Sequence, residues 1–224
     1  MKKLLFLLLL FKHFSLFSQD ADVLLQKVVS KISSVKDYSV NAFIRTDIPF
    51  IKMLPINAKI YFKQKDKFKI ASKGIVIIPK QGFTDVNNFL LNKKLYTTVD
   101  GGTKTIGQVK TSLIILIPVS EDSEFILAKL WVDPVKAVII SSQITTKTSG
   151  MLNISYSYAS EIKFGLPSEL TFEIDIKKFK LPKSVTSNKK NSSNDNSKKK
   201  GVITIKLSNY IVNKGINDAI FEKK

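Results

Sequence analysis

The sequence has no cysteine and a single histidine, His13. His13 lies in the start MKKLLFLLLLFKHFSLFSQD, which is typical of a secretory signal, with Lys2 and Lys3 before an apolar run and small residues near a cut after Ser18. We therefore expect residues 1–18 to be a signal peptide. The mature chain then lacks imidazole and thiol groups, which excludes cysteine and histidine nucleophiles, Ser-His triads, zinc sites built on nitrogen or sulfur, and disulfides.

Long apolar runs are missing as well. The run Leu4 to Phe11 is too short for a membrane-spanning helix of roughly 20 residues, and the later run Leu113 to Val119 contains Pro118. We expect cleavage and export to the periplasm, with an uncleaved anchor as the alternative. Since the chain has no cysteine, a lipid-modified N-terminus is excluded.

Arginine is nearly absent although the chain is strongly basic. Lysine and arginine total 36 against 18 acidic residues, which gives a net charge of +18, yet Arg45 is the only arginine. Proteins that read nucleic acids usually depend on arginine for bidentate contacts. We expect no nucleic-acid partner and a solvated lysine surface, while a polyanion or an anionic membrane surface stays open as a partner.

The acidic residues give no convincing catalytic pair. Glu173 and Asp175 lie two apart on an expected strand, and with Glu169 they could mimic the carboxylates of a glycosidase. Exposed surface charge is the more common explanation. No glycine-rich phosphate loop is present. We predict a protein that is not an enzyme, with no catalytic residue, no metal ligand and no cofactor.

Two hydrophobic periods divide the chain after the signal. Apolar residues at Leu24, Val28, Ile32 and Val35 share one face of an expected helix over 21–35. After Asp37 the period changes to two in most segments, which predicts nine to eleven antiparallel strands with one covered face. One helix cannot cover so large a sheet, so the sheet must curl as a barrel, a half-barrel or a sandwich.

Three later segments give weaker signals. Asp100-Gly101 is a turn signal for a hairpin. Residues 110–120 fit a helix or a strand. Residues 183–201 are polar and rich in lysine, asparagine and serine, and we expect them to be a disordered excursion within a single domain spanning 19–224. This excursion is either a tolerated insertion or a segment that contacts anionic headgroups.

Several segments in order resemble the outer-membrane lipoprotein carrier superfamily, the LolA-like and lipoprotein-sorting proteins. They are the helix DVLLQKVVSKISSVKDY, the strands IYFKQKDKFKI, the turn LWVDPVKAVI around Trp131, Asp133 and Pro134, and the hairpin FGLPSELTF. The resemblance implies an incomplete antiparallel β-barrel, or half-barrel, that is mainly β and lidded by one or a few helices. It also implies a periplasmic carrier that shields the acyl chains of a lipoprotein or lipid on the way to the outer membrane, with an inner-membrane transporter and an outer-membrane acceptor as partners.

The resemblance breaks down in one segment. The family usually has a proline where this chain has Lys65, and often a basic residue where it has Gln64. The arginine latch of well-known carriers therefore cannot be carried over. Arg45 could substitute for it, although a solvated outward charge is the simpler explanation.

The inward rows of the expected strands are the only site that we predict. They would either line a lipid cavity or fill an ordinary core, and the resemblance favours the cavity. A structural or polyanion-binding envelope β-protein without lipid cargo is the alternative function. The predicted lipid-binding residues are Val40, Ala42, Ile44, Ile60, Phe62, Phe68, Ile70, Leu130, Val132, Ile140, Leu152, Ile154, Tyr156, Leu170, Phe172, Ile174, Ile203 and Ile205.

Overall fold

The structure is a computed structural model that describes residues 16–49, 53–65, 67–78, 86–148, 150–175 and 200–222. Most of the expected signal peptide and most of the expected excursion lie outside these ranges. The expected cut after Ser18 falls inside a described helix. Lys200 and Gly201, which we assigned to the excursion, begin the last strand instead.

Ten antiparallel strands form one sheet, in the order β3-β2-β1-β10-β9-β8-β7-β6-β5-β4. The chain makes a three-stranded meander, crosses to the opposite edge, and returns strand by strand until β10 pairs with β1. The strands are β1 (Asp37–Asp47), β2 (Ile56–Lys63), β3 (Lys67–Ser72), β4 (Tyr96–Ile106), β5 (Val109–Pro118), β6 (Phe125–Asp133), β7 (Val138–Thr146), β8 (Gly150–Ser157), β9 (Glu169–Asp175) and β10 (Lys200–Val212).

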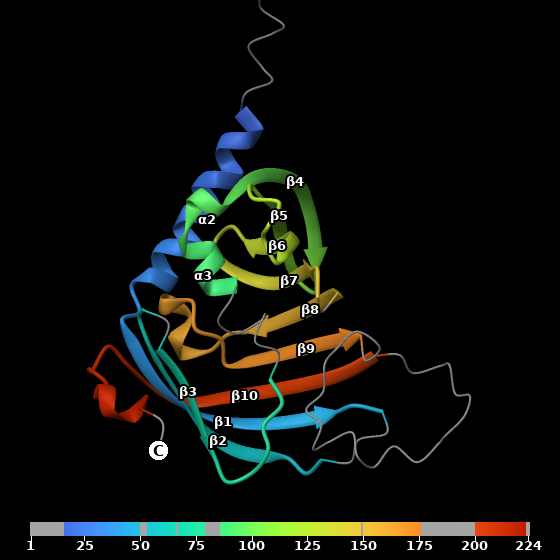
Figure 1. The fold of residues 1–224 in the computed structure, drawn as a ribbon. Coiled ribbons are helices and arrows are strands. Elements are labelled where there is room, and N and C mark those ends of the chain that lie inside the picture. Colours follow the sequence, from blue (N-terminus) through green and yellow to red (C-terminus); the bar gives the residue numbers. More distant parts are fainter. Residues whose placement is uncertain are drawn as a thin grey trace, which may run out of the picture.

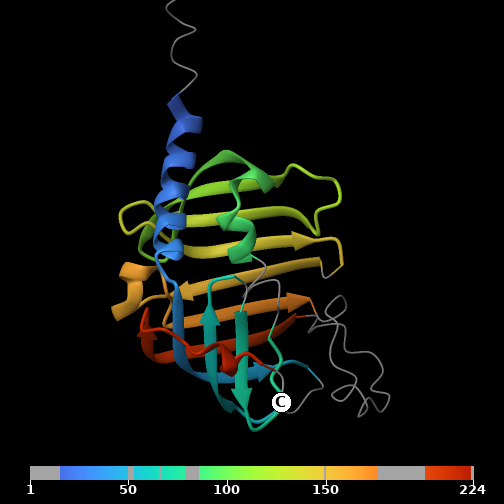
Figure 2. The same cartoon turned by 60° about the vertical axis from the view of Figure 1, so that its left-hand side comes forward.

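The sheet curls strongly, and its edge strands β3 and β4 do not pair with each other (Figure 1). Helices α2 (Leu16–Ser33) and α3 (Val86–Leu91) lie over its concave face, as the turned view also shows (Figure 2). The prediction of a mainly β fold, an incomplete antiparallel barrel lidded by helices, is confirmed. Short 3₁₀ turns complete the described elements: η3 (Lys93–Leu95), η4 (Ser160–Phe164) and η5 (Asp218–Ile220).

The concave face carries one apolar core. Strand residues of alternating parity, such as Ile60, Leu130 and Phe172, are fully buried there, and the other faces of the same strands are more exposed. From α2, Leu25 and Val28 join the same cluster. Within the described ranges, no helix combines the length and apolar character needed to cross a membrane.

The hairpin expected at Asp100-Gly101 exists, but its turn is elsewhere. Strands β4 and β5 are joined at Gly107, and the Asp100-Gly101 pair lies inside β4 at a β-bulge. The Asp100 carboxylate accepts a hydrogen bond from the Gly102 amide at 2.8 Å, which stabilises the bulge. A Cβ at Gly101 would lie 2.5 Å from Cγ of Leu113, so glycine is required there by close approach.

Two further bulges change which side chains face the core. On β7 the register shifts beside Ile139, so that Ile139 is buried and Ile140 is only half-buried. On β10 an extra residue beside Asn209, which has φ of 56°, brings Tyr210 to the core side after Leu207. A bulge inserts one residue and reverses the parity beyond it. The strict alternation that placed Ile140 with Val138 and Ile144 was wrong for this reason.

Candidate functional site

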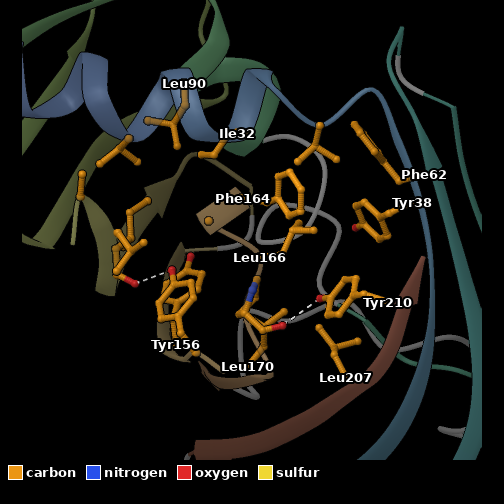
Figure 3. Close-up of a pocket in the computed structure, with 18 residues that line it drawn as sticks. Ile32, Tyr38, Phe62, Leu90, Tyr156, Phe164, Leu166, Leu170, Leu207 and Tyr210 are labelled. Atoms are coloured by element: carbon orange, nitrogen blue, oxygen red, sulfur yellow. Dashed lines mark hydrogen bonds between the residues drawn. The ribbon is translucent and has the colours of Figure 1, made fainter. Parts of the chain in front are cut away.

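A cavity lies between the C-terminal half of α2 and the concave face of the sheet (Figure 3). Its volume is about 90 Å³. Pockets that bury most of a drug-sized ligand usually have about 300–1,000 Å³. The cavity is therefore narrow. Its lining residues are Val28, Ile32, Val35, Tyr38, Phe62, Leu90, Ala137, Val138, Ile139, Tyr156, Tyr158, Phe164, Gly165, Leu166, Pro167, Leu170, Leu207 and Tyr210.

The wall of the cavity is apolar apart from phenol groups. On α2, Val28 and Ile32 are four residues apart and share one face of the helix, and Val35 lies just beyond the helix end; together they close one side of the cavity. Tyrosine is the only residue type with a polar side chain among the eighteen that line it. Such a surface can hold hydrocarbon and cannot balance a charge.

Three of the tyrosine hydroxyls hold the fold together. The Tyr156 and Ser142 hydroxyls share a hydrogen bond at 3.0 Å. Tyr158 donates to the Ile139 carbonyl at 2.8 Å. Tyr210 donates to the carbonyl of Pro167, also at 2.8 Å (Figure 3). These bonds tie β7, β8, the segment before β9, and β10 around the cavity.

Burial raises the pKa of each phenol that lines the cavity. The pKa of Tyr156 is raised to about 12, and the Ser142 hydroxyl opposes part of that shift. The pKa values of Tyr38, Tyr158 and Tyr210 are raised as well, with burial as the first cause. The phenols therefore stay neutral at physiological pH and act as hydrogen-bonding groups.

The C-terminal end of α2 is fixed to three other parts of the chain. The Lys31 ammonium donates to the Lys136 carbonyl at 2.6 Å. The Gln64 side-chain amide donates to the carbonyls of Ser33 at 2.9 Å and Val35 at 3.1 Å. Terminal carbonyls of a helix have no partner within the helix, so the Gln64 amide caps α2 at Ser33, whereas Lys31 ties the helix to the turn before β7.

Asn213, just after β10, contacts the same junction. Its side chain donates to the Ser34 carbonyl at 3.0 Å and accepts from the Lys36 amide at 2.7 Å. Gly215 donates to the Asp37 carboxylate at 3.0 Å. The end of β10 and the start of β1, which are neighbouring strands, therefore meet where α2 leads into β1.

This junction explains the departure from the family pattern. Lys65 has φ of 68°, a value that the proline ring forbids, so the turn between β2 and β3 differs from a proline turn. Gln64 lies beside it and contacts the helix end directly. Arg45 is exposed on β1, and within the described ranges no ion pair ties it to the lid.

The carboxylates considered as a catalytic set do not approach the cavity. Glu169 pairs with Lys206 at 4.0 Å and Glu173 with Lys200 at 3.5 Å, all on the outer face of β9 and β10. Among the described residues, no group of three or more histidine, cysteine, aspartate or glutamate side chains could hold a metal ion.

The structure brings only three of the predicted site residues to the cavity: Phe62, Tyr156 and Leu170. Most of the others pack in the apolar cluster elsewhere on the concave face, and Ile140 lies outside both. Their contact with lipid stays a prediction. The members of the cluster away from the cavity are Val40, Ala42, Ile44, Ile60, Leu130, Val132, Leu152, Ile154, Phe172, Ile174, Ile203 and Ile205, with Phe68 and Ile70 packed against it.

Sequence reasoning missed most of the lining. Val28, Ile32 and Val35 were recognisable from their spacing, and the resemblance implied a helical lid, but none of the three was assigned to the site. Tyr38 and Leu207 had the inward parity that could have included them. Phe164 and Leu166, in the η4 turn and the loop after it, give no periodic signal at all.

A larger depression of about 950 Å³ lies over β1, β2 and β3. Its lining includes the exposed side chains of Asn41, Asn57 and Lys59, and it is open to solvent. Such a surface cannot exclude water from an acyl chain, so the cavity under α2 is the better candidate site.

No known protein family matches the sequence, and neither does any curated protein. Solved structures do match. A LolA superfamily protein from Nitrosomonas europaea is similar with a TM-score of 0.58 and 14% identity, over 91% of this chain and 97% of that one. The fold is LolA-like.

Two more structures agree with this likeness. A putative outer-membrane lipoprotein-sorting protein domain from Vibrio parahaemolyticus has a TM-score of 0.58 at 6% identity and covers 90% and 97% of the two chains. A DUF1329 family protein from Desulfovibrio piger has a TM-score of 0.61 at 12% identity and covers 92% and 97%. The LolA-like resemblance seen in the sequence motifs is confirmed at the level of the fold.

Proposed function

We propose that the protein is a periplasmic carrier that shields the acyl chains of a lipoprotein or lipid on its way towards the outer membrane. The observation that supports this most is the apolar cavity under α2, whose lining contains no ionised side chain. The cavity lies between a curled sheet and a helix in a protein of LolA-like fold, which supports the same proposal. An inner-membrane donor and an outer-membrane acceptor are the partners that such transfer needs.

The energetics make a carrier necessary. Each buried methylene contributes about 0.8 kcal/mol, so a chain of ~14 carbons offers on the order of 10 kcal/mol on leaving water. The cavity as described admits only part of such a chain. We infer that loading separates α2 from the η4 turn, a movement that the Lys31 bond to the Ile162 carbonyl of η4, at 3.5 Å, opposes.

A fluorescent acyl probe tests the site. The Leu166→Glu variant places a carboxylate in the cavity wall and is expected to weaken binding at least tenfold. Ile115→Glu is the matched control, since Ile115 is equally half-buried but lies on the outer face of β5, opposite the buried Ile114 and Leu116. Equal loss in both variants, or unchanged binding in both, contradicts the assignment of the site.

A polyanion-binding envelope protein without lipid cargo is the rival function. It predicts a partner that is released at moderate salt and no retained acyl chain, because contacts between exposed charges are screened.

Export is tested separately by the intact mass of protein from a periplasmic extract. A mass that begins at or near residue 19 supports cleavage after Ser18, and a mass that retains Met1 supports an anchor.

A further inference from the structure

The open depression over β1, β2 and β3 gathers polar groups and an aromatic ring on the outer face of the sheet. Strands β10, β1 and β2 lie side by side there (Figure 1). In register, Asn41 of β1 lies between Ser208 of β10 and Lys59 of β2. Two residues further along β1, Phe43 lies beside Asn57 of β2. The pairing therefore brings one ring, two amides, a hydroxyl and an ammonium group to the same hollow of about 950 Å³, the outer depression.

The Phe43 ring is available to a ligand. It is 42% exposed, whereas its neighbours on β1, Ala42 and Ile44, are buried on the concave face. Of the described aromatic rings, none stacks on it. An exposed phenylalanine gives up the stabilisation that burial would provide, and its electron-rich face is free to pack on another molecule.

The two asparagines are unusual at these positions. Asparagine is depleted in strands, and the comparable outward positions of β9 hold Thr171 and Glu173. Asn41 and Asn57 are both exposed, and neither amide makes a hydrogen bond to another described residue. Each amide offers an acceptor oxygen and two N–H donors, so the pair can exchange hydrogen bonds with a ligand that carries several hydroxyls.

The charges around the outer depression favour an anionic ligand. Among the described residues, four cationic side chains line it or lie beside it on the same face, against two carboxylates. The cations are Arg45, Lys59, Lys73 and Lys206, and the carboxylates are Asp47 and Glu169. Glu169 is already paired with Lys206 at 4.0 Å. The remaining positive charge attracts a carboxylate or phosphate group and disfavours a cation.

We propose that the outer depression binds a sugar ring that carries an anionic group, as in an acidic polysaccharide. A pyranose ring has an apolar C–H face, which packs on the electron-rich face of an aromatic ring, and hydroxyls at its edge. Phe43 contacts the C–H face, Asn41 and Asn57 bond to the hydroxyls, and the lysines balance the charge. This site is separate from the acyl cavity, which lies on the opposite face of the sheet.

Calorimetric titration of the purified protein with tetragalacturonate, a short chain of uronic acids, tests the site. The Phe43→Ala variant is expected to bind about 10-fold more weakly, because the aromatic contact is lost. The Asn57→Ala variant is expected to lose about 2- to 10-fold, the effect of one hydrogen bond. Met151→Ala is the matched control and should bind as the wild type does, because Met151 is 47% exposed on β8 and lies outside the depression.

Two further compounds separate sugar recognition from charge attraction. Polyglutamate has carboxylates without a sugar ring, and maltotetraose has sugar rings without charge. Both are expected to bind more weakly than tetragalacturonate, maltotetraose by about 2- to 5-fold for each ion pair that it cannot form. No binding of tetragalacturonate, equal binding of either other compound, or unchanged affinity in both Phe43→Ala and Asn57→Ala would overturn the proposal. Acyl-probe binding by Phe43→Ala should equal that of the wild type, so failure here leaves the carrier function untouched.

Discussion

Gln64 offers the sharpest test of how the lid is held. Its side-chain amide donates to the carbonyl of Ser33, the last residue of α2, and to that of Val35, in the segment that leads from α2 to β1. The Gln64→Ala variant loses both bonds. Each neutral hydrogen bond contributes about 0.5–1.5 kcal/mol, and Gln64 is exposed, so the loss should be about 1–2 kcal/mol. For a chain of this size, that lowers the thermal midpoint by roughly 2–8 °C.

Hydrogen exchange locates the effect. The Ser34 amide bonds to the Ser30 carbonyl at 3.1 Å and the Val35 amide to the Ile32 carbonyl at 3.2 Å. Both amides should exchange faster in Gln64→Ala, because local opening of the helix end becomes easier. Since Ile32 and Val35 also line the cavity, an acyl probe should enter the variant faster than the wild type.

Two further variants control this experiment. Gln108→Ala removes a glutamine from the exposed turn between β4 and β5 and should change neither midpoint nor exchange. Gln64→Arg supplies a cation at the helix C-terminus and should retain or increase the protection of α2. Unchanged exchange at Ser34 and Val35 in Gln64→Ala would refute the account of the lid junction.

The remaining predictions concern charge and packing. The Lys63 and Lys67 ammonium groups, 2.6 and 3.0 Å from Asp218, hold the pKa of that carboxyl below its ordinary value. A carboxyl whose pKa is lower in the folded than in the unfolded protein stabilises the fold above the unfolded pKa, and this stability is lost as the pH falls through the folded pKa. The thermal midpoint of Asp218→Asn should therefore drop less than that of the wild type between about pH 7 and about pH 3. An equal drop in both proteins would refute the ion pairs. Gly101→Ala should cost about 1–3 kcal/mol in the free energy of unfolding, measured by urea titration, because its Cβ would overlap Leu113, and an unchanged midpoint would contradict that contact.

The sequence predicts the sheet well because a two-residue period survives in most strands. Phe172 and Ile154 are buried as their parity requires. Prediction fails where a bulge adds one residue, as at Ile140 and before Tyr210, because no local pattern announces the reversed parity. The glycines beside Asp100 correctly indicate an irregular backbone, but such a sequence fits either a turn or a bulge, and this chain forms the bulge.

The cavity is harder to predict than the sheet. Its lining comes from α2, α3, the η4 turn, six strands and the loops beside them, which meet only in the folded chain. Whether an inward side chain fills space or borders a cavity depends on the lid above it. Leu170 and Phe172 have the same parity on β9, yet Leu170 lines the cavity and Phe172 packs in the solid core.

The carrier function is tested most directly by native mass spectrometry. The full chain is expressed with its own start, extracted from the cell envelope without detergent, and measured intact. We expect a population carrying the added mass of an acylated molecule, which Leu166→Glu should remove and Ile115→Glu should retain. A wild-type protein that is lipid-free in every preparation would contradict the carrier function.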